Sequence, residues 1–314
     1  MGLTIGIDIG GTKVAGGVVD DSGAVVARVL RATPSHDPEE VERVIADVVA
    51  ELAKGRRIEA VGLGAAGFID EGRSIVRFSA NLAWRHEPLR ERVERRTGLP
   101  VVVENDGNAA AWAEYRYGAG LDADPLLVVC VGTGIGGGIV VGGRLLRGAF
   151  GTASEFGHFR VVPDGVLCGC GQWGCWEQYA SGNALVREAR TRAAADPKRA
   201  ATLLALGGGT PDGITGRHVT HAAQRGDLVA LAAFGVVGDW LGQGIADLVE
   251  TLDPRRVVLG GGVSEAGPLL LEPTQRAYEA ALSGGSNRPH AELVLAALGN
   301  EAGVVGAADL ARRR

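Results

Sequence analysis

A strand, a glycine-rich turn and a returning strand occur twice in this chain, near its start and near its middle. The first copy reads Ile7-Asp8-Ile9-Gly10-Gly11-Thr12-Lys13, and the second reads Val131-Gly132-Thr133-Gly134-Ile135-Gly136-Gly137-Gly138. Each copy follows apolar residues, and each places small and hydroxyl-bearing residues at the turn. The repetition predicts two related lobes around a cleft.

Apolar patterns alternate between the periods of strands and helices, which favours an α/β fold with mixed sheets. We expect strands at residues 3–8, 14–19, 25–32, 60–64, 101–104, 126–131, 139–141 and 257–259, and a glycine-rich turn at 132–138. We expect helices at residues 38–54, 89–97, 108–117 and 237–252, and a closing helix that ends near Arg312. Asp37 is the predicted N-cap of the first helix, because Pro38 follows it.

The segment Asp122-Ala123-Asp124-Pro125 has the composition of a linker between the halves. We therefore expect an N-terminal lobe of residues 1–121 and a C-terminal lobe of residues 122–314. The last helix is a candidate to pack back on the N-terminal lobe.

Composition and charge argue against several classes of protein. The net charge of −5 offers no basic surface for nucleic acid. Residues 1–4 lack the positive segment of a signal peptide, and the longest apolar stretch, residues 228–238, is too short to span a bilayer and ends at Asp239. We expect a cytoplasmic protein without nucleic-acid or membrane partners.

The glycine turns have the composition of phosphate-binding loops. Several backbone N–H groups must point at a phosphate, and glycine leaves that approach open. Neither turn fits the Walker or Rossmann pattern, and either one alone is equally compatible with an ordinary hairpin. Two turns at corresponding positions, together with Gly260-Gly261-Gly262 after a late strand, favour a nucleotide site. Asp8 is expected to hold Mg²⁺ directly or through water, or only to order the turn.

Three of the four cysteines lie within a short segment, which favours a metal over a disulfide framework. His158 with Cys168, Cys170 and Cys175 forms a Cys₃His set, typical of closed, tetrahedral, structural zinc sites. The alternative is three free surface thiols. Cys130 lies in an apolar run and is expected to be an inert core thiol.

Acids and amides cluster around the two turns. Asn105 and Asp106 sit between a strand end and a helix start, where either residue caps the helix or Asp106 acts as a general base. Glu155 and His158 follow the second turn, and Glu177 follows Cys175. Carboxylates and amides together match the donors and acceptors of a polyhydroxyl ligand such as a sugar.

The first turn, the second turn, Glu155-Phe156-Gly157-His158 and the segment 168–177 together resemble the ROK family (repressors, open reading frames, kinases). The resemblance runs over nearly the whole chain in the same order and is strongest to the bacterial glucokinases of that family. It implies a duplicated, two-lobed, actin-like and hexokinase-like (ribonuclease H-like) ATPase fold, with ATP bound in the cleft between the lobes.

The resemblance also implies a role for individual residues. Asp106 would be the catalytic base, and the sugar would be held by Gly67, Asn81, Asn105, Asp106, Glu155, His158 and Glu177. ATP and Mg²⁺ would be held by Asp8, Gly10, Gly11, Thr12, Lys13, Thr133 and Gly134, with Gly261 and Gly262 at the adenosine end. Zinc would be held by His158, Cys168, Cys170 and Cys175.

The implied reaction is transfer of the γ-phosphoryl group of MgATP to the C6 hydroxyl of glucose. Two alternatives remain: a kinase for N-acetylglucosamine, mannose or fructose, and a non-catalytic sugar sensor. The family's repressors carry an N-terminal DNA-binding domain, which we do not expect here because the sequence opens on the first strand. A homodimer or homotetramer is implied as well.

Overall fold

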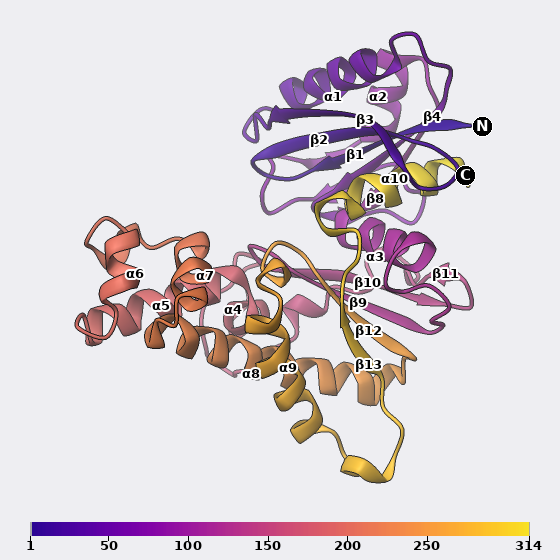
Figure 1. The fold of residues 1–314 in the computed structure, drawn as a ribbon. Coiled ribbons are helices and arrows are strands. Elements are labelled where there is room, and N and C mark those ends of the chain that lie inside the picture. Colours follow the sequence, from indigo (N-terminus) through magenta and orange to yellow (C-terminus); the bar gives the residue numbers. More distant parts are fainter. Residues whose placement is uncertain (1, 314) are drawn as a thin grey trace. The chain divides into compact units, whose positions relative to one another are not determined.

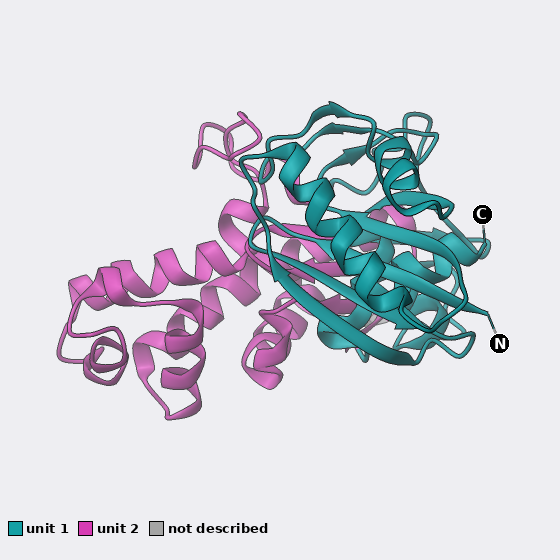
Figure 2. Cartoon of the chain, turned by 90° about the horizontal axis from the view of Figure 1, so that it is seen from above, with its two compact units in different colours: residues 1–128, 137–155, 297–314 teal, residues 129–136, 156–296 magenta. Residues whose placement is uncertain are grey.

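The computed structural model of the chain describes residues 2–313 and divides into two compact units (Figure 2). Unit 1 comprises residues 1–128, 137–155 and 297–314, and unit 2 comprises residues 129–136 and 156–296. The lobe boundary at residues 121/122 stays a prediction. The segment expected to be the linker lies inside unit 1, where the Asp124 carboxylate accepts hydrogen bonds from the backbone N–H groups of Gly142 (2.8 Å) and Gly143 (2.7 Å).

Two five-stranded sheets form the centre of the fold. The first contains β1 (Leu3–Ile9), β2 (Lys13–Val19), β3 (Val25–Ala32), β4 (Ile58–Ala65) and β8 (Val101–Asn105). The second contains β9 (Leu126–Val131), β10 (Ile135–Val141), β11 (Arg144–Leu145), β12 (Arg256–Gly260) and β13 (Glu292–Leu295). Their orders are β3-β2-β1-β4-β8 and β11-β10-β9-β12-β13, so the same arrangement occurs twice. The predicted duplication of an α/β unit is thus confirmed.

Helices and a small third sheet complete the described chain. The third sheet consists of β5 (Phe68–Ile69), β6 (Val76–Phe78) and β7 (Arg85–Glu87). The α-helices are α1 (Pro38–Ala53), α2 (Leu89–Thr97), α3 (Asp106–Tyr117), α4 (Glu177–Ala180), α5 (Gly182–Ala195), α6 (Ala201–Leu206), α7 (Gly216–Gln224), α8 (Leu228–Leu252), α9 (Pro268–Ala281) and α10 (Ala302–Arg312). Single 3₁₀ turns occur at Phe156–His158, Pro211–Gly213, Ser264–Ala266, Gly285–Asn287 and Gly299–Glu301.

In unit 1 the first sheet is covered by helices on both faces: α1 and α2 lie on one, and α3 and α10 on the other (Figure 1). Ile5, Ile7 and Ile9 of β1 are fully buried between these layers. The sheet has glycine where α10 crosses it. A Cβ atom on Gly6 or on Gly62 would lie 1.8 Å from a backbone carbonyl oxygen of α10. These glycines let the closing helix pack directly on the strands.

A buried carboxylate fixes α10 in unit 1. The Asp309 side chain accepts hydrogen bonds from the Trp112 indole N–H (2.9 Å) and the Tyr117 hydroxyl (2.7 Å). It also forms ion pairs with Arg312 (3.1 Å) and Arg313 (2.8 Å). Because each of these donors has its partner, the buried charge is compensated.

In unit 2, α8 is the longest helix and packs against α9 and α5. The apolar stretch expected to end at Asp239 continues as a helix to Leu252. By length and composition α8 is able to cross a membrane, but half of its most apolar window is buried inside the fold. Core helices of soluble proteins share this property.

Candidate active site

The first glycine turn joins β1 to β2 in unit 1. The Gly10 N–H donates to the Lys13 carbonyl oxygen (3.0 Å), and the Thr33 hydroxyl donates to the Gly10 carbonyl oxygen (2.8 Å). A Cβ atom on Gly11 would lie 3.1 Å from the Cβ of Asn81. The predicted phosphate turn and a predicted sugar residue therefore lie side by side.

Three strands bring acidic residues to one end of the first sheet. β1, β4 and β8 are parallel, and their register places Asp8 opposite Gly64 and Gly64 opposite Glu104. Asp106 follows as the first residue of α3. Ligand sites in open α/β sheets form at the carboxyl ends of parallel strands, which is where these acids gather.

The structure separates the two roles that sequence left open at Asn105 and Asp106. Asn105 is the N-cap of α3, because its side-chain oxygen accepts the N–H of Asn108 (3.0 Å). Its amide nitrogen donates to the carbonyl oxygen of Gly67 (3.2 Å), another predicted sugar residue. Asp106 accepts a local hydrogen bond from the Gly107 N–H (2.9 Å) and does not serve as the cap.

Burial makes both acids harder to ionise. It raises the pKa of Asp106 above the usual value of 3.8, against the opposing hydrogen bond from Gly107. Burial and the negative charge of Asp106 raise the pKa of Asp8 to about 6, although Lys13 acts in the other direction. Two carboxylates that disfavour each other's charge suit a site for a cation.

Asp8→Asn is expected to stabilise the protein near neutral pH in buffer without added magnesium. The folded state holds the Asp8 proton up to about pH 6 but the unfolded state only to 3.8, so ionisation opposes folding as pH rises through that window. This cost is at most about 3 kcal/mol. The melting temperature should rise near neutral pH and match the wild type at about pH 3, below the unfolded pKa of 3.8. The exposed Asp212→Asn is the control, and a variant no more stable than wild type near neutral pH would contradict the burial of this charge.

In unit 2 the predicted metal ligands come together. The ligand atoms of His158, Cys168, Cys170 and Cys175 all lie within 4.8 Å of one another. The Sγ atoms of Cys170 and Cys175 are 3.7 Å apart, as are Cys168 Sγ and His158 Nδ1. In a tetrahedral site with Zn–S bonds of about 2.3 Å, neighbouring sulfurs are about 3.8 Å apart. The four residues therefore fit a structural zinc ion, whereas Cys130 is half-buried on β9.

Glu177 links this cluster to the second glycine turn within unit 2. One carboxylate oxygen lies 3.0 Å from Cys168 Sγ and 4.0 Å from His158 Nδ1. The other accepts a hydrogen bond from the Ile135 N–H (3.3 Å) at the start of β10. Gly134 is needed beside it, because a Cβ atom there would lie 2.2 Å from the same oxygen.

The second glycine turn gathers three segments at the ends of β9 and β12. The Gly182 N–H, at the start of α5, donates to the Gly132 carbonyl oxygen (2.8 Å). The Val263 N–H donates to the Val131 carbonyl oxygen (3.0 Å). Gly261, which follows β12, has a φ of 81°, and a Cβ atom there would lie 2.6 Å from the Val131 carbonyl oxygen. The third glycine run thus lies beside the second turn.

The predicted residues form two groups. Unit 1 holds Asp8, Gly10, Gly11, Thr12, Lys13, Gly67, Asn81, Asn105, Asp106 and Glu155. Unit 2 holds Thr133, Gly134, His158, Cys168, Cys170, Cys175, Glu177, Gly261 and Gly262.

The sequence model of the ROK family matches residues 4–314. The chain belongs to the ROK family. Glucokinase of Streptomyces coelicolor is 54% identical over 312 residues, which cover 99% of this chain and 98% of that protein. Glucokinase of Thermotoga maritima is 36% identical over 312 residues, which cover 99% and 97%. The crystal structure of a ROK family glucokinase from Streptomyces griseus, in complex with glucose and AMPPNP, matches with a TM-score of 0.95 at 55% identity over all of both chains.

These matches confirm the family predicted from the motifs, and with it the actin-like, hexokinase-like fold of the ROK kinases. The protein is accordingly an ATP-dependent sugar kinase by family and fold.

Sequence reasoning missed one group of residues in this ROK chain. Glu104 precedes Asn105 and is 1% exposed, and its carboxylate forms ion pairs with Arg73 (3.1 Å) and Arg147 (2.9 Å). A glutamate at a strand end is usually solvated, so its residue type alone gives no signal. The clue that the sequence offered was the apolar residue directly before it, Val103, which the structure shows to be fully buried.

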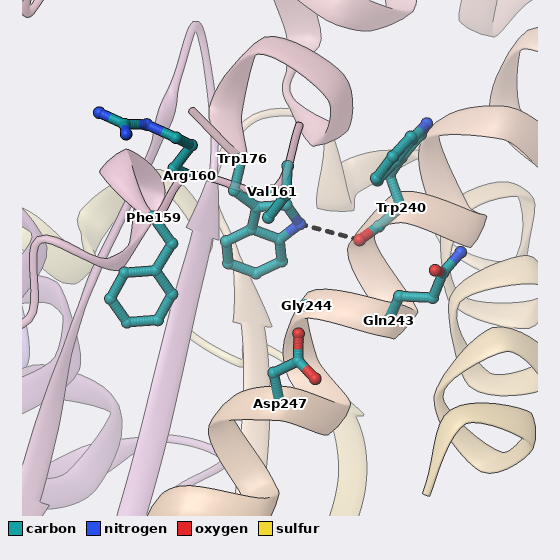
Figure 3. Close-up of a pocket in the computed structure, with 8 residues that line it drawn as sticks. All are labelled: Phe159, Arg160, Val161, Trp176, Trp240, Gln243, Gly244 and Asp247. Carbon is teal, nitrogen blue, oxygen red and sulfur yellow. Dashed lines mark hydrogen bonds between the residues drawn. The ribbon is translucent and has the colours of Figure 1, made fainter. Parts of the chain in front are cut away.

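Aromatic residues hold the loop of residues 158–175, which carries the predicted zinc ligands, against α8. The Trp176 indole N–H donates to the Trp240 carbonyl oxygen (2.8 Å), as Figure 3 shows. The Tyr179 hydroxyl accepts the Val166 N–H (2.8 Å), and its ring lies 4.9 Å from that of Trp240. The loop that carries His158 and Glu177 is thereby attached to the core of unit 2.

A cavity of about 470 Å³ lies between this loop and α8, and none of the predicted site residues lines it (Figure 3). It is lined by Phe159, Arg160, Val161, Trp176, Trp240, Gln243, Gly244 and Asp247. Trp176 is only 1% exposed, so its ring offers no open face to a ligand.

Proposed function

We propose that this ROK protein is a glucokinase, which transfers the γ-phosphoryl group of MgATP to the C6 hydroxyl of glucose. The observation that carries the proposal is the match over the whole chain, at 55% identity, to a ROK glucokinase in complex with glucose and AMPPNP. The placement of Asp106 supports it, because this acid lies at the carboxyl end of β8 and is not used as a helix cap.

In this proposal Asp106 accepts the proton of the attacking hydroxyl. Its raised pKa brings it closer to the range in which a carboxylate is an effective base near neutral pH. Asn105 is fixed by its capping hydrogen bond and by Gly67, so it presents a rigid amide to the sugar. Asn81, Glu155, His158 and Glu177 supply the remaining sugar contacts.

The phosphates are held by backbone N–H groups of both glycine turns and by the Lys13 ammonium group. Thr133 and Gly134 contribute from unit 2, and Gly261 and Gly262 face the adenosine. Asp8 holds Mg²⁺, which neutralises charge on the phosphates when bound. His158, Cys168, Cys170 and Cys175 would hold zinc and leave it no open position, so its role would be to order the loop that carries His158 and Glu177.

A hexose panel tests this function. Purified protein with MgATP is offered glucose, mannose, fructose and N-acetylglucosamine, and ADP release and the position of the new phosphate are measured. We expect the highest kcat/KM for glucose and phosphorylation at C6. A higher kcat/KM for another hexose would identify a different sugar kinase, and ADP release that no sugar stimulates would favour a sensor.

The proposal extends to the setting of the enzyme. Glucokinases act on a small polar substrate with ATP, which is consistent with a cytoplasmic enzyme, and the family resemblance favours a homodimer or homotetramer. Light scattering on the purified protein measures the latter directly.

A further inference from the structure

A cluster of one buried carboxylate and two partly buried guanidinium groups lies directly before the predicted base. The Glu104 carboxylate is 1% exposed and lies 2.9 Å from Arg147 Nε and 3.1 Å from Arg73 Nε. Burying such charges costs desolvation free energy, and apolar residues of similar volume often stabilise a fold as well or better. Stability alone therefore gives no reason for these charges at this place.

One oxygen of Glu104 orders the start of α3. It accepts hydrogen bonds from the Asn105 N–H (3.0 Å) and from the Asn108 side-chain amide (3.1 Å). The Asn108 N–H in turn donates to the Asn105 side chain (3.0 Å). Glu104 thus fixes the helix turn on which Asp106 lies.

The other oxygen of Glu104 faces Arg147, which also holds two backbone carbonyl oxygens. Besides the ion pair, Arg147 donates to the carbonyl oxygens of Glu71 (2.9 Å) and Asp70 (2.8 Å). Its own carbonyl oxygen accepts the Ala153 N–H (3.1 Å) and closes the loop of residues 147–153. Arg147 therefore attaches this loop both to the turn after β5 and to Glu104.

The loop continues directly to a predicted sugar residue. Gly151 lies against the same turn, where a Cβ atom would be 2.5 Å from the Ile69 carbonyl oxygen. Glu155 follows Ala153 by two residues, and all of these residues belong to unit 1. Only Ser154 lies between the hydrogen-bonded end of this loop and Glu155.

We propose that the Glu104–Arg147 ion pair positions Glu155 relative to Asp106, so that both meet the hydroxyl groups of one sugar. The two residues are positioning residues and do not touch the substrate. The inference rests on the proposed function and names how the sugar half of that site is assembled. Arginine suits this place because its planar fork donates to two carbonyl oxygens while its Nε lies against Glu104, which a lysine ammonium group does not match in geometry.

Arg147→Met is expected to raise the KM for glucose by about 10- to 100-fold, because small displacements of positioned groups carry penalties of this size. The KM for ATP should stay unchanged, since the predicted phosphate residues do not contact the cluster. Arg147→Lys should recover part of the loss. The control is Arg77→Met, which removes an exposed ion pair with Glu71 at the same turn and should leave both constants unchanged.

The double variant Glu104→Gln/Arg147→Met separates positioning from stability, because glutamine keeps a side-chain oxygen for the Asn105 N–H and the Asn108 amide. It removes the buried pair together and leaves Arg73, whose side chain is 27% exposed, in reach of water. We expect its melting temperature to return to or exceed that of the wild type, while the KM for glucose stays raised and the Ala153 amide exchanges hydrogen faster.

Each result decides the matter. A wild-type KM for glucose in Arg147→Met, or a double variant that regains that KM together with its stability, would overturn the inference and leave the glucokinase assignment intact. A wild-type protein that phosphorylates no hexose would overturn the proposed function, and the inference with it.

Discussion

Asp106→Ala is expected to lower kcat for glucose phosphorylation by about 10²- to 10⁴-fold, the usual contribution of a general base. The helix should survive the change, because Asn105 and not Asp106 caps α3. Zinc content should therefore match the wild type, and the melting temperature should not fall, because the buried carboxyl that is lost resists ionisation. A coupled assay of glucose 6-phosphate measures kcat, and a variant with wild-type turnover would refute the base assignment.

The pH profile provides a second test of the same residue. Asp106 works as a base only when ionised, so activity falls as pH falls through its pKa in the folded protein. Because burial raises that pKa, the acid limb of kcat/KM should lie above the usual carboxylate value of 3.8. The matched control is Asp37→Asn, which keeps a capping side chain at the start of α1 and should leave the profile unchanged.

The sequence predicts a structural feature well where a residue type in a given pattern has one usual structural role. Asp37 caps α1 as expected, accepting the N–H groups of Glu39 (3.1 Å) and Glu40 (3.2 Å). The Cys₃His set also gathers as expected, because three thiols and an imidazole at this spacing match the ligands of one tetrahedral ion. Both features are local, so neighbouring residues are enough to read them.

Glycine was harder to interpret, because the same residue serves several purposes. The second turn was expected at residues 132–138, but β10 already begins at Ile135. Gly138 is a strand residue, and a Cβ atom there would lie 2.7 Å from the Cβ of Ala111 on α3. Gly107 on α3 likewise faces the Gly137 backbone, 2.5 Å from where its Cβ would be. These glycines permit close packing of α3 on β10 and do not face a phosphate turn.

Long-range ion pairs could not be predicted from the sequence, for a different reason. Glu104 and Arg147 lie on separate elements, and each looks like an ordinary surface residue in its own segment. The helices α5, α6 and α7 also went unpredicted, and α6 has only six residues, too few to show a helical period. Such features depend on tertiary packing, which a single sequence does not display.

Loss of zinc is the second change with a large expected effect. Structural zinc contributes roughly 10–16 kcal/mol of apparent binding free energy in small domains, which is comparable to the roughly 5–15 kcal/mol stability of a whole protein. Burial raises the pKa of the Cys168 and Cys175 thiols, so without metal these side chains stay protonated and make only weak contacts near neutral pH. The metal is therefore the main force that joins His158 to the cysteine segment.

Cys175→Ser should reduce zinc from about one ion per chain to well below that, since three ligands hold zinc less tightly than four. Cys175 is fully buried in a backbone β-bridge with Arg160. Loss of the metal at this position should therefore disorder the loop and displace Glu177, which lies 3.0 Å from Cys168 Sγ. We expect a lower melting temperature and a strongly raised KM for glucose, measured alongside elemental analysis. Cys130→Ser, outside the cluster, is the control and should keep its zinc. Full activity in metal-free protein would show that the loop, and with it the sugar contacts of unit 2, forms without the ion.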